Sequence, residues 1–203
     1  VQRGARKIFG IIPIEVVAIM NMRAFEAFCA RHSGYRPSEI DQRVRPLREL
    51  DLVPHGPRGP AAPHLEATHG AVAILSMVAR RAADTKDVVK RAMNLKAIAR
   101  DGWLPFEGKG TDLVPMIALA LATSGVVERI EILGDASLAW VTLVLDGERR
   151  TILFADDEKI INFVTSFPDT YDSTGAHYMG HRFVMTAALA EALAQELACE
   201  VTE

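Results

Sequence analysis

The sequence predicts an α+β protein in which a helical N-terminal domain precedes a small domain with a three-stranded antiparallel sheet and helices. Hydrophobic residues recur with a helical period up to about residue 95, and with a period of two from about residue 126 to 155. Asp146-Gly147 separates the last two period-two runs and is typical of a two-residue hairpin turn. The charge also changes sign along the chain. Residues 1–100 carry 17 Lys and Arg against 9 Asp and Glu, whereas residues 101–203 carry 6 against 17.

Residues 1–21 are expected to form a leader outside the core. Three basic residues precede an apolar stretch at 8–20, an order that resembles a signal peptide. Pro13 and Glu15 interrupt this stretch, and no small-residue cleavage site follows it. A leader from an upstream start codon, with Met20 or Met22 as the true start, is the preferred interpretation.

Residues 22–100 are predicted to form a helical domain. A first helix runs from Met22 to the glycine at Gly34, which tolerates a left-handed cap. Pro37 and Ser38 open a second helix, with Ser38 and Asp41 as a weak capping box. Four aliphatic residues form its predicted buried stripe, namely Ile40, Val44, Leu47 and Leu50. Pro46 lies inside this pattern and is expected to kink or split the helix.

The remaining helices of this domain follow a loop. Residues 51–64 hold four prolines and two glycines and are predicted to be irregular. A third helix is expected over residues 66–83, and Asp84 or Thr85 caps a fourth. Residues 100–111 are predicted to be the loop between the two domains.

Residues 101–203 are predicted to form an acidic α+β domain for dimerisation or sensing. A short apolar helix runs from Asp112 to Gly125, and strands follow at about 126–133, 137–145 and 149–155. A closing helix is expected from Tyr178 to Ala198. Its predicted apolar stripe consists of Met185, Leu189, Leu193 and Leu197, and this stripe covers either the sheet or a second copy.

The first two predicted helices have the spacing of a helix-turn-helix. Ala30 falls where the helices would cross, Gly34 at the turn, and Ile40 at the anchor of the second helix. The next anchor, Val44, comes one residue later than usual. The exposed face of the second helix is predicted to carry Gln42, Arg43 and Arg45, with Ser38 and Glu39 at its start, and Gln and Arg are side chains that contact base edges.

The segment PSEIDQRVRPLRELDLVPHGPRGPAAPHL resembles the helix-turn-helix and winged-helix segments of bacterial regulators, including prophage-type proteins. The resemblance covers about residues 24–80. It implies binding of double-stranded DNA, often as a homodimer, with contacts from Ser38, Gln42, Arg43, Arg45 and Arg58. It implies nothing about residues 101–203.

A second basic cluster occurs in the fourth predicted helix. Lys86, Lys90 and Arg91 lie along one face, where Lys90 could contact phosphate. A solvated helix exterior is the simpler interpretation of this cluster alone.

Metal binding is a weaker alternative. His177 and His181 are four residues apart, with Asp169 and Asp172 upstream, but the pattern lacks the glutamate of H-E-x-x-H, and Gly180 separates the histidines. No metal site is therefore assigned.

Composition narrows the function classes. The chain is 49% hydrophobic and 24% charged, with no apolar run of about 18–20 residues and only two cysteines, Cys29 and Cys199. These values exclude a disordered chain, a disulfide-rich mini-protein and a zinc finger, and they favour a cytoplasmic protein without a membrane partner.

From the helix-turn-helix spacing and the charge pattern we expect a DNA-binding transcriptional regulator that is not an enzyme and needs no cofactor. A phage-type structural or DNA-packaging adaptor is the alternative, and a metal-dependent enzyme using Asp169–His181 ranks third.

Overall fold

An antiparallel sheet and a helical assembly make up the fold. The computed structural model describes residues 21–56, 63–98, 112–122, 126–134, 136–145, 147–156 and 182–192. The helical elements are α1 (Met22–Ser33), α2 (Pro37–Glu49), α3 (Ala67–Leu75), η1 (Ala82–Asp84), α4 (Thr85–Met93) and α5 (Leu113–Ala122). The strands are β1 (Lys96–Ile98), β2 (Val127–Leu133), β3 (Leu138–Leu145), β4 (Glu148–Ala155) and β5 (Arg182–Thr186). The predicted α+β class is confirmed.

The sheet has five strands in the order β1-β4-β3-β2-β5, so the prediction of three strands was wrong. The three predicted strands and their hairpin are present as β2, β3 and β4. Leu145 pairs with Glu148 across the two-residue turn, and Gly147 has a φ of 79°, which suits glycine there. The additional strands β1 and β5 lie at the two edges.

The prediction of a closing helix over residues 178–198 was wrong at residues 182–186 and is confirmed at residues 187–192, and its other residues lie outside the described part. Residues 182–186 form β5, which pairs with β2 from Arg129↔Thr186 to Leu133↔Arg182. This segment contains Phe, Val and Thr, which favour strands, whereas the alanine-rich sequence begins only at Ala187. Met185 is therefore a buried strand residue, and helix covers only residues 187–192 of the described part. Leu193 and Leu197 lie outside the described residues, and the row from Met185 to Leu197 is not one helical stripe.

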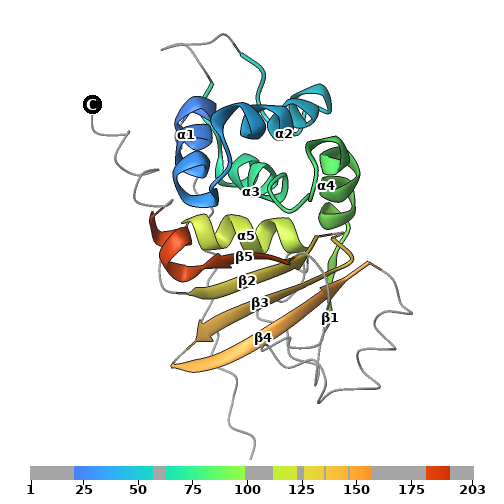
Figure 1. The fold of residues 1–203 in the computed structure, drawn as a ribbon. Coiled ribbons are helices and arrows are strands. Elements are labelled where there is room, and N and C mark those ends of the chain that lie inside the picture. The colour runs from blue at the N-terminus through green and yellow to red at the C-terminus, as the bar shows by residue number, and fades with distance from the viewer. Residues whose placement is uncertain are drawn as a thin grey trace, which may run out of the picture.

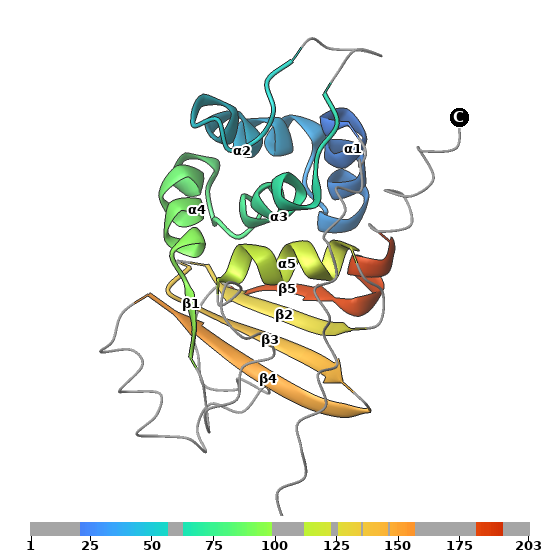
Figure 2. The ribbon, with the colours of Figure 1, turned by 180° about the vertical axis from the view of Figure 1, so that it is seen from behind.

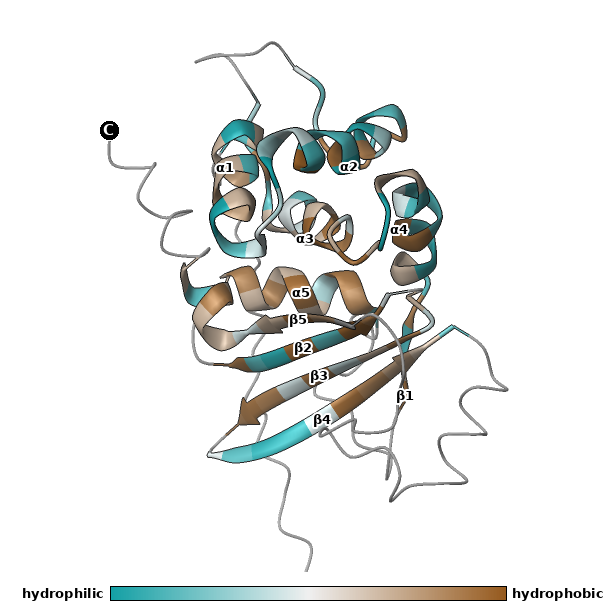
Figure 3. Cartoon of the chain, viewed as in Figure 1, coloured by the Kyte–Doolittle hydropathy of each residue, from teal (hydrophilic) through white to brown (hydrophobic). Residues whose placement is uncertain are grey.

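Helix α5 lies between the sheet and the other helices (Figures 1 and 2). Its sequence is almost entirely apolar because it is buried on both sides, as its hydrophobic colouring shows in Figure 3. Helix α3 packs on it closely at Gly70, where an added Cβ would lie 3.3 Å from Leu121 Cδ1. A small residue is needed at this crossing because a larger side chain would push the two helices apart.

One hydrophobic core crosses the expected domain boundary at residues 100–111. A single cluster contains Phe25 of α1, Leu75 of α3, Ile117 of α5 and Phe154 of β4. Strand β1, which precedes that boundary, pairs with β4, which follows it. A smaller cluster of Leu133, Leu138, Trp140 and Ala155 lies apart from this core. The helical elements and the sheet therefore depend on shared packing.

Several helix ends differ from prediction. Helix α2 continues through Pro46 to Glu49, so the expected split was wrong. It starts with Arg36 as N-cap, whose backbone N–H donates to the Glu39 carboxylate at 2.9 Å; the capping box of Ser38 and Asp41 was therefore wrong. Helix α3 ends at Leu75 instead of residue 83. Asp84 precedes α4 as predicted. Within the described ranges, no helix is long and apolar enough to cross a membrane.

Candidate nucleic-acid interface

The first two helices and their turn are present as predicted. The Asn21 side chain accepts a hydrogen bond from the Ala24 backbone N–H at 3.0 Å and so caps α1. Gly34 ends this helix with a φ of 74°, which confirms its predicted left-handed cap. Three residues, 34–36, then connect α1 to α2. The connection is short enough to hold α2 in a fixed position against α1.

The outer face of α2 carries three of the predicted contact residues. Ser38, Gln42 and Arg45 are exposed at helical spacing. Ser38 lies in the first turn of α2, where the helix dipole favours an anion and where the Glu39 carboxylate already accepts from the Arg36 N–H. The hydrophilic colouring of α2 in Figure 3 marks this outward side.

An ion-pair network offsets the charge of Asp41, one of three acidic residues in α2. Asp41 accepts from Arg45 Nη2 at 2.8 Å and from Arg48 Nη1 at 2.9 Å, and Arg48 also reaches Glu26 at 2.6 Å. Hydrogen bonds from Arg45 and then Arg48 hold the pKa of Asp41 below its usual value of 3.8. The Arg45 side chain nevertheless remains 62% exposed, and such exposed pairs exchange partners at little cost.

The prediction that Arg43 lies on the exposed face was wrong. Its side chain is buried, and its guanidinium donates to the carbonyl of Ala79 at 2.5 Å and to that of Arg80 at 3.4 Å. It also lies over the Tyr35 ring, with 4.3 Å from Cζ to the centroid. Burial removes Arg43 from the set of base contacts and makes it the residue that fixes α2 to the turn at 79–81.

The sequence contained a signal for this burial. Arg43 shares the spacing of Ile40, Val44 and Leu47, which are all fully buried. An arginine on that face needs carbonyl partners, and these come from a turn 36 residues further along the chain. Local spacing alone does not show them.

A group of exposed cations lies next to this anchor. Arg80 and Arg81 occupy the turn that Arg43 binds, and Lys86 and Lys90 extend the group along the outside of α4. Within the described part of the chain, no carboxylate lies within salt-bridge distance of these four side chains. We call Arg80, Arg81, Lys86 and Lys90 the cation group. An unpaired group of this kind attracts a polyanion.

Arg58 lies outside the described residues. Its flanking residues are close together, because a Cβ at Gly56 would collide with the ring of Pro63. Just beyond, His64 forms an isolated bridge with Asn21 at the start of α1. The described residues on either side of this segment, Gly56 and Pro63, therefore lie next to each other, and the chain that follows them contacts the start of α1.

The predicted metal alternative falls outside the described residues, since Asp169, Asp172, His177 and His181 all lie there. In the described ranges, no three His, Cys, Asp or Glu side chains are grouped as a metal site would require. His69 instead accepts from the backbone N–H of Glu66 at 3.3 Å and caps α3.

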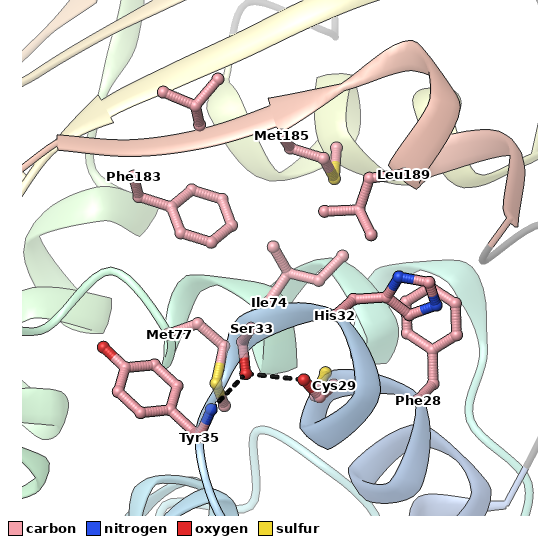
Figure 4. A pocket seen from close by; sticks show the side chains of 11 residues that line it. Phe28, Cys29, His32, Ser33, Tyr35, Ile74, Met77, Phe183, Met185 and Leu189 are labelled. Carbon is pink, nitrogen blue, oxygen red and sulfur yellow. Dashed lines mark hydrogen bonds between the residues drawn. The ribbon is translucent and has the colours of Figure 1, made fainter.

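A pocket of about 240 Å³ lies between the helices and β5 (Figure 4). Phe183 and Met185 project from β5, and Leu189 from the helical residues 187–192, toward Phe28 of α1 and Met77 of the turn after α3. Burial raises the pKa of Cys29, which also lines the pocket, to about 12, with Glu26 adding to the effect. Cys29 is therefore a neutral thiol at physiological pH and a poor nucleophile. The sequence did not indicate this pocket, since its walls come from three distant segments.

The chain matches no family model, no curated protein and no solved structure. Two features of the structure bear on its function: the polar face of α2 with the cation group, and the apolar pocket beside α1.

Proposed function

We propose that the protein binds double-stranded DNA as a transcriptional regulator, with α2 in the major groove. The observation that carries this proposal is that buried Arg43 of α2 binds the Ala79 and Arg80 carbonyls, which fixes the start of the cation group against this helix. Recognition needs side chains that read base edges and cations that hold the phosphate backbone on either side. Here α2 carries the first set, and the turn bound by its Arg43 begins the second.

Base reading is assigned to Gln42 and Arg45. Glutamine can bond adenine and arginine can bond guanine through two hydrogen bonds each. Arg45 has to exchange Asp41 for a base, and Arg48 remains as the partner of Asp41 when it does so. Ser38 is assigned to a phosphate at the N-terminus of α2.

Phosphate binding is assigned to the cation group, and Arg58 is proposed as a further contact from its loop. Each neutralised phosphate releases condensed counterions, so affinity must fall steeply as salt rises. Arg43 acts as a positioning residue because it holds the Arg80 backbone against α2.

A homodimer is part of the proposal. One helix-turn-helix reads a short half-site, and twofold pairing is the common way to lengthen the site. Sedimentation velocity of the full chain, alone and with a palindromic duplex, tests this point separately from DNA binding.

The decisive experiment measures DNA affinity of the full chain by fluorescence anisotropy between 50 and 200 mM salt. The double variant Lys86→Ala/Lys90→Ala should lower affinity for all duplexes alike and reduce the salt slope by about 2, one per lost contact. The matched control is Arg149→Ala/Arg150→Ala on the β3–β4 hairpin, which also removes two exposed cations.

Three outcomes contradict the proposal or redirect it. Absence of salt-dependent binding at low ionic strength contradicts it, as does an equal loss in the hairpin control. Equal affinity for random and genomic duplexes would instead assign the chain to sequence-independent DNA contact, as in a packaging or assembly protein.

A further inference from the structure

The pocket beside α1 has the size and chemistry of a small-ligand site. Its volume of about 240 Å³ exceeds the roughly 150 Å³ of a cavity known to hold benzene. It can therefore hold a molecule of one or two rings. None of its lining residues is Lys, Arg, Asp or Glu, so the walls offer no fixed charge to an ionic ligand.

The walls favour an aromatic ligand. Phe28 and Phe183 supply ring faces and edges, and Met77 and Met185 supply polarisable thioethers that contact aromatic rings favourably. Unbranched methionine side chains also adapt to the shape of a guest. Leu189 is half-buried at the side of β5 and closes the pocket there (Figure 4).

Two polar groups are available to orient a ligand. Tyr35 and His32 line the same pocket, and within the described ranges neither the Tyr35 hydroxyl nor the His32 ring nitrogens have a hydrogen-bond partner. Ser33 is already engaged, since its hydroxyl donates to the Cys29 carbonyl at 2.6 Å and accepts from the Tyr35 N–H at 3.2 Å. A few placed polar groups in an otherwise apolar pocket are the usual arrangement of a small-molecule site.

We propose that this pocket binds a neutral aromatic molecule of one or two rings that carries a single hydrogen-bonding group, and that this ligand regulates DNA binding. The second half of the proposal rests on the proposed function. Tyr35 carries the connection: its ring borders the pocket and lies over the guanidinium of Arg43, which binds the Ala79 and Arg80 carbonyls beside the cation group. A guest that shifts Tyr35 therefore acts on the contact that places α2 against this group.

Ligand binding is tested first, in the absence of DNA, with indole as the probe. Titration of indole into the full chain with isotope-labelled methionine methyl groups should shift Met77 and Met185 saturably. Leu189→Trp should abolish this binding because the larger side chain fills the pocket from its half-buried side. Leu145→Trp, also at a half-buried apolar position but at the end of β3, is the matched control and should leave binding intact.

Coupling is tested second, by DNA affinity with and without saturating indole. Indole should change DNA affinity by about 5- to 150-fold, and DNA should change indole affinity by the same factor, because coupling between sites is reciprocal. At indole concentrations that saturate each variant, Tyr35→Leu should lose the coupling, whereas Tyr35→Phe, which keeps the ring over Arg43, should retain most of it.

Each of the other outcomes contradicts one part of the proposal, either the ligand site or its regulation of DNA binding. Failure of indole to shift the methionine methyls, or equal binding in Leu189→Trp, removes the ligand site whether or not the protein binds DNA. If the wild-type chain dimerises and does not bind indole, and if Leu189→Trp makes it monomeric, then the pocket is a contact between two copies of the chain and not a ligand site. Indole binding together with unchanged DNA affinity would overturn the regulatory half alone, and absence of DNA binding would contradict the proposed function and leave the ligand site standing.

Discussion

The outer surface of α2–α4 and the sheet both carry arginines, but the two regions differ in whether these side chains form ion pairs. On the sheet, Arg129, Arg149 and Arg150 each pair with a glutamate, at 2.5, 2.8 and 2.9 Å. In the cation group, no described carboxylate is within reach of any member. Charge totals along the sequence indicated a basic half and an acidic half, but pairing decides which cations are available to a polyanion. Among these described side chains, the four of the cation group are available in this sense, whereas Arg129, Arg149 and Arg150 are not.

The two regions nevertheless share one core, and the largest predicted effect tests this. Phe25→Ala in α1 and Phe154→Ala in β4 should each destabilise the protein by about 3–5 kcal/mol, because both side chains are fully buried in one cluster. Urea unfolding followed by far-UV circular dichroism and by tryptophan fluorescence should show one coincident transition, shifted by either change.

Two separable transitions would contradict this prediction, especially if Phe154→Ala moved only the fluorescence. Phe25→Leu and Phe154→Leu serve as milder variants in case the alanine variants do not fold. The same measurement decides whether residues 22–100 can be studied alone or whether DNA binding requires the full chain.

The second prediction concerns the functional difference between the regions. Gln42→Ala and Arg45→Ala should each reduce discrimination between a specific and a random duplex by about 1–3 kcal/mol, the value of a lost two-bond contact to a base. Arg149→Ala removes an exposed arginine from the sheet and should change neither affinity. Competition binding measures the affinities for the specific and the random duplex. An equal loss of affinity for all duplexes would mean that Gln42 and Arg45 contact phosphates instead of bases.

Local sequence pattern predicted much of this fold because the spacing of hydrophobic residues and the residues at caps and turns define many of its elements. Helices α1, α2 and α4, strands β2 to β4, the Gly34 cap and the Asp146-Gly147 turn all follow from spacing and turn chemistry. Strand β5 was missed because its five residues adjoin an alanine-rich helical sequence, and its partner β2 lies about 50 residues earlier. Edge strands depend on such distant pairing.

The candidate site was predictable to a smaller extent. Ser38, Gln42, Arg45 and Lys90 lie at exposed positions, as their helical spacing required. The role of Arg43 depends on carbonyls in a distant turn, and the pocket depends on α1, α3 and β5 meeting in space. Neither is a property of any single window of sequence.

The third prediction compares two glycines, one in each region. Gly34 and Gly147 both have positive φ values, 74° and 79°, and an added Cβ would meet nothing within 4 Å at either position. Gly34→Ala and Gly147→Ala should therefore each cost about 1 kcal/mol, from the left-handed backbone alone. Only Gly34→Ala should also weaken DNA binding, because it alters the connection that orients α2. An equal effect of Gly147→Ala on DNA affinity would contradict the assignment of binding to the helical surface.

The smallest predicted effect separates stability from function at Asp41. Arg45 and Arg48 lower the pKa of this carboxylate, so its ionised form stabilises the folded state. That contribution is complete above the unfolded pKa of about 3.8 and is lost as pH falls through the lower folded value. Asp41→Asn should thus lower the free energy of unfolding by less than about 1 kcal/mol at pH 7, since the pairs are partly exposed, and the difference from wild type should disappear in strong acid.

The same change, Asp41→Asn, removes a negative charge from α2 and releases Arg45, so DNA affinity should rise while stability falls. Thermal unfolding at pH 7 and pH 2, with anisotropy at pH 7, measures both quantities. A fall in both at pH 7 would mean that Asp41 holds Arg45 in the orientation that DNA binding needs.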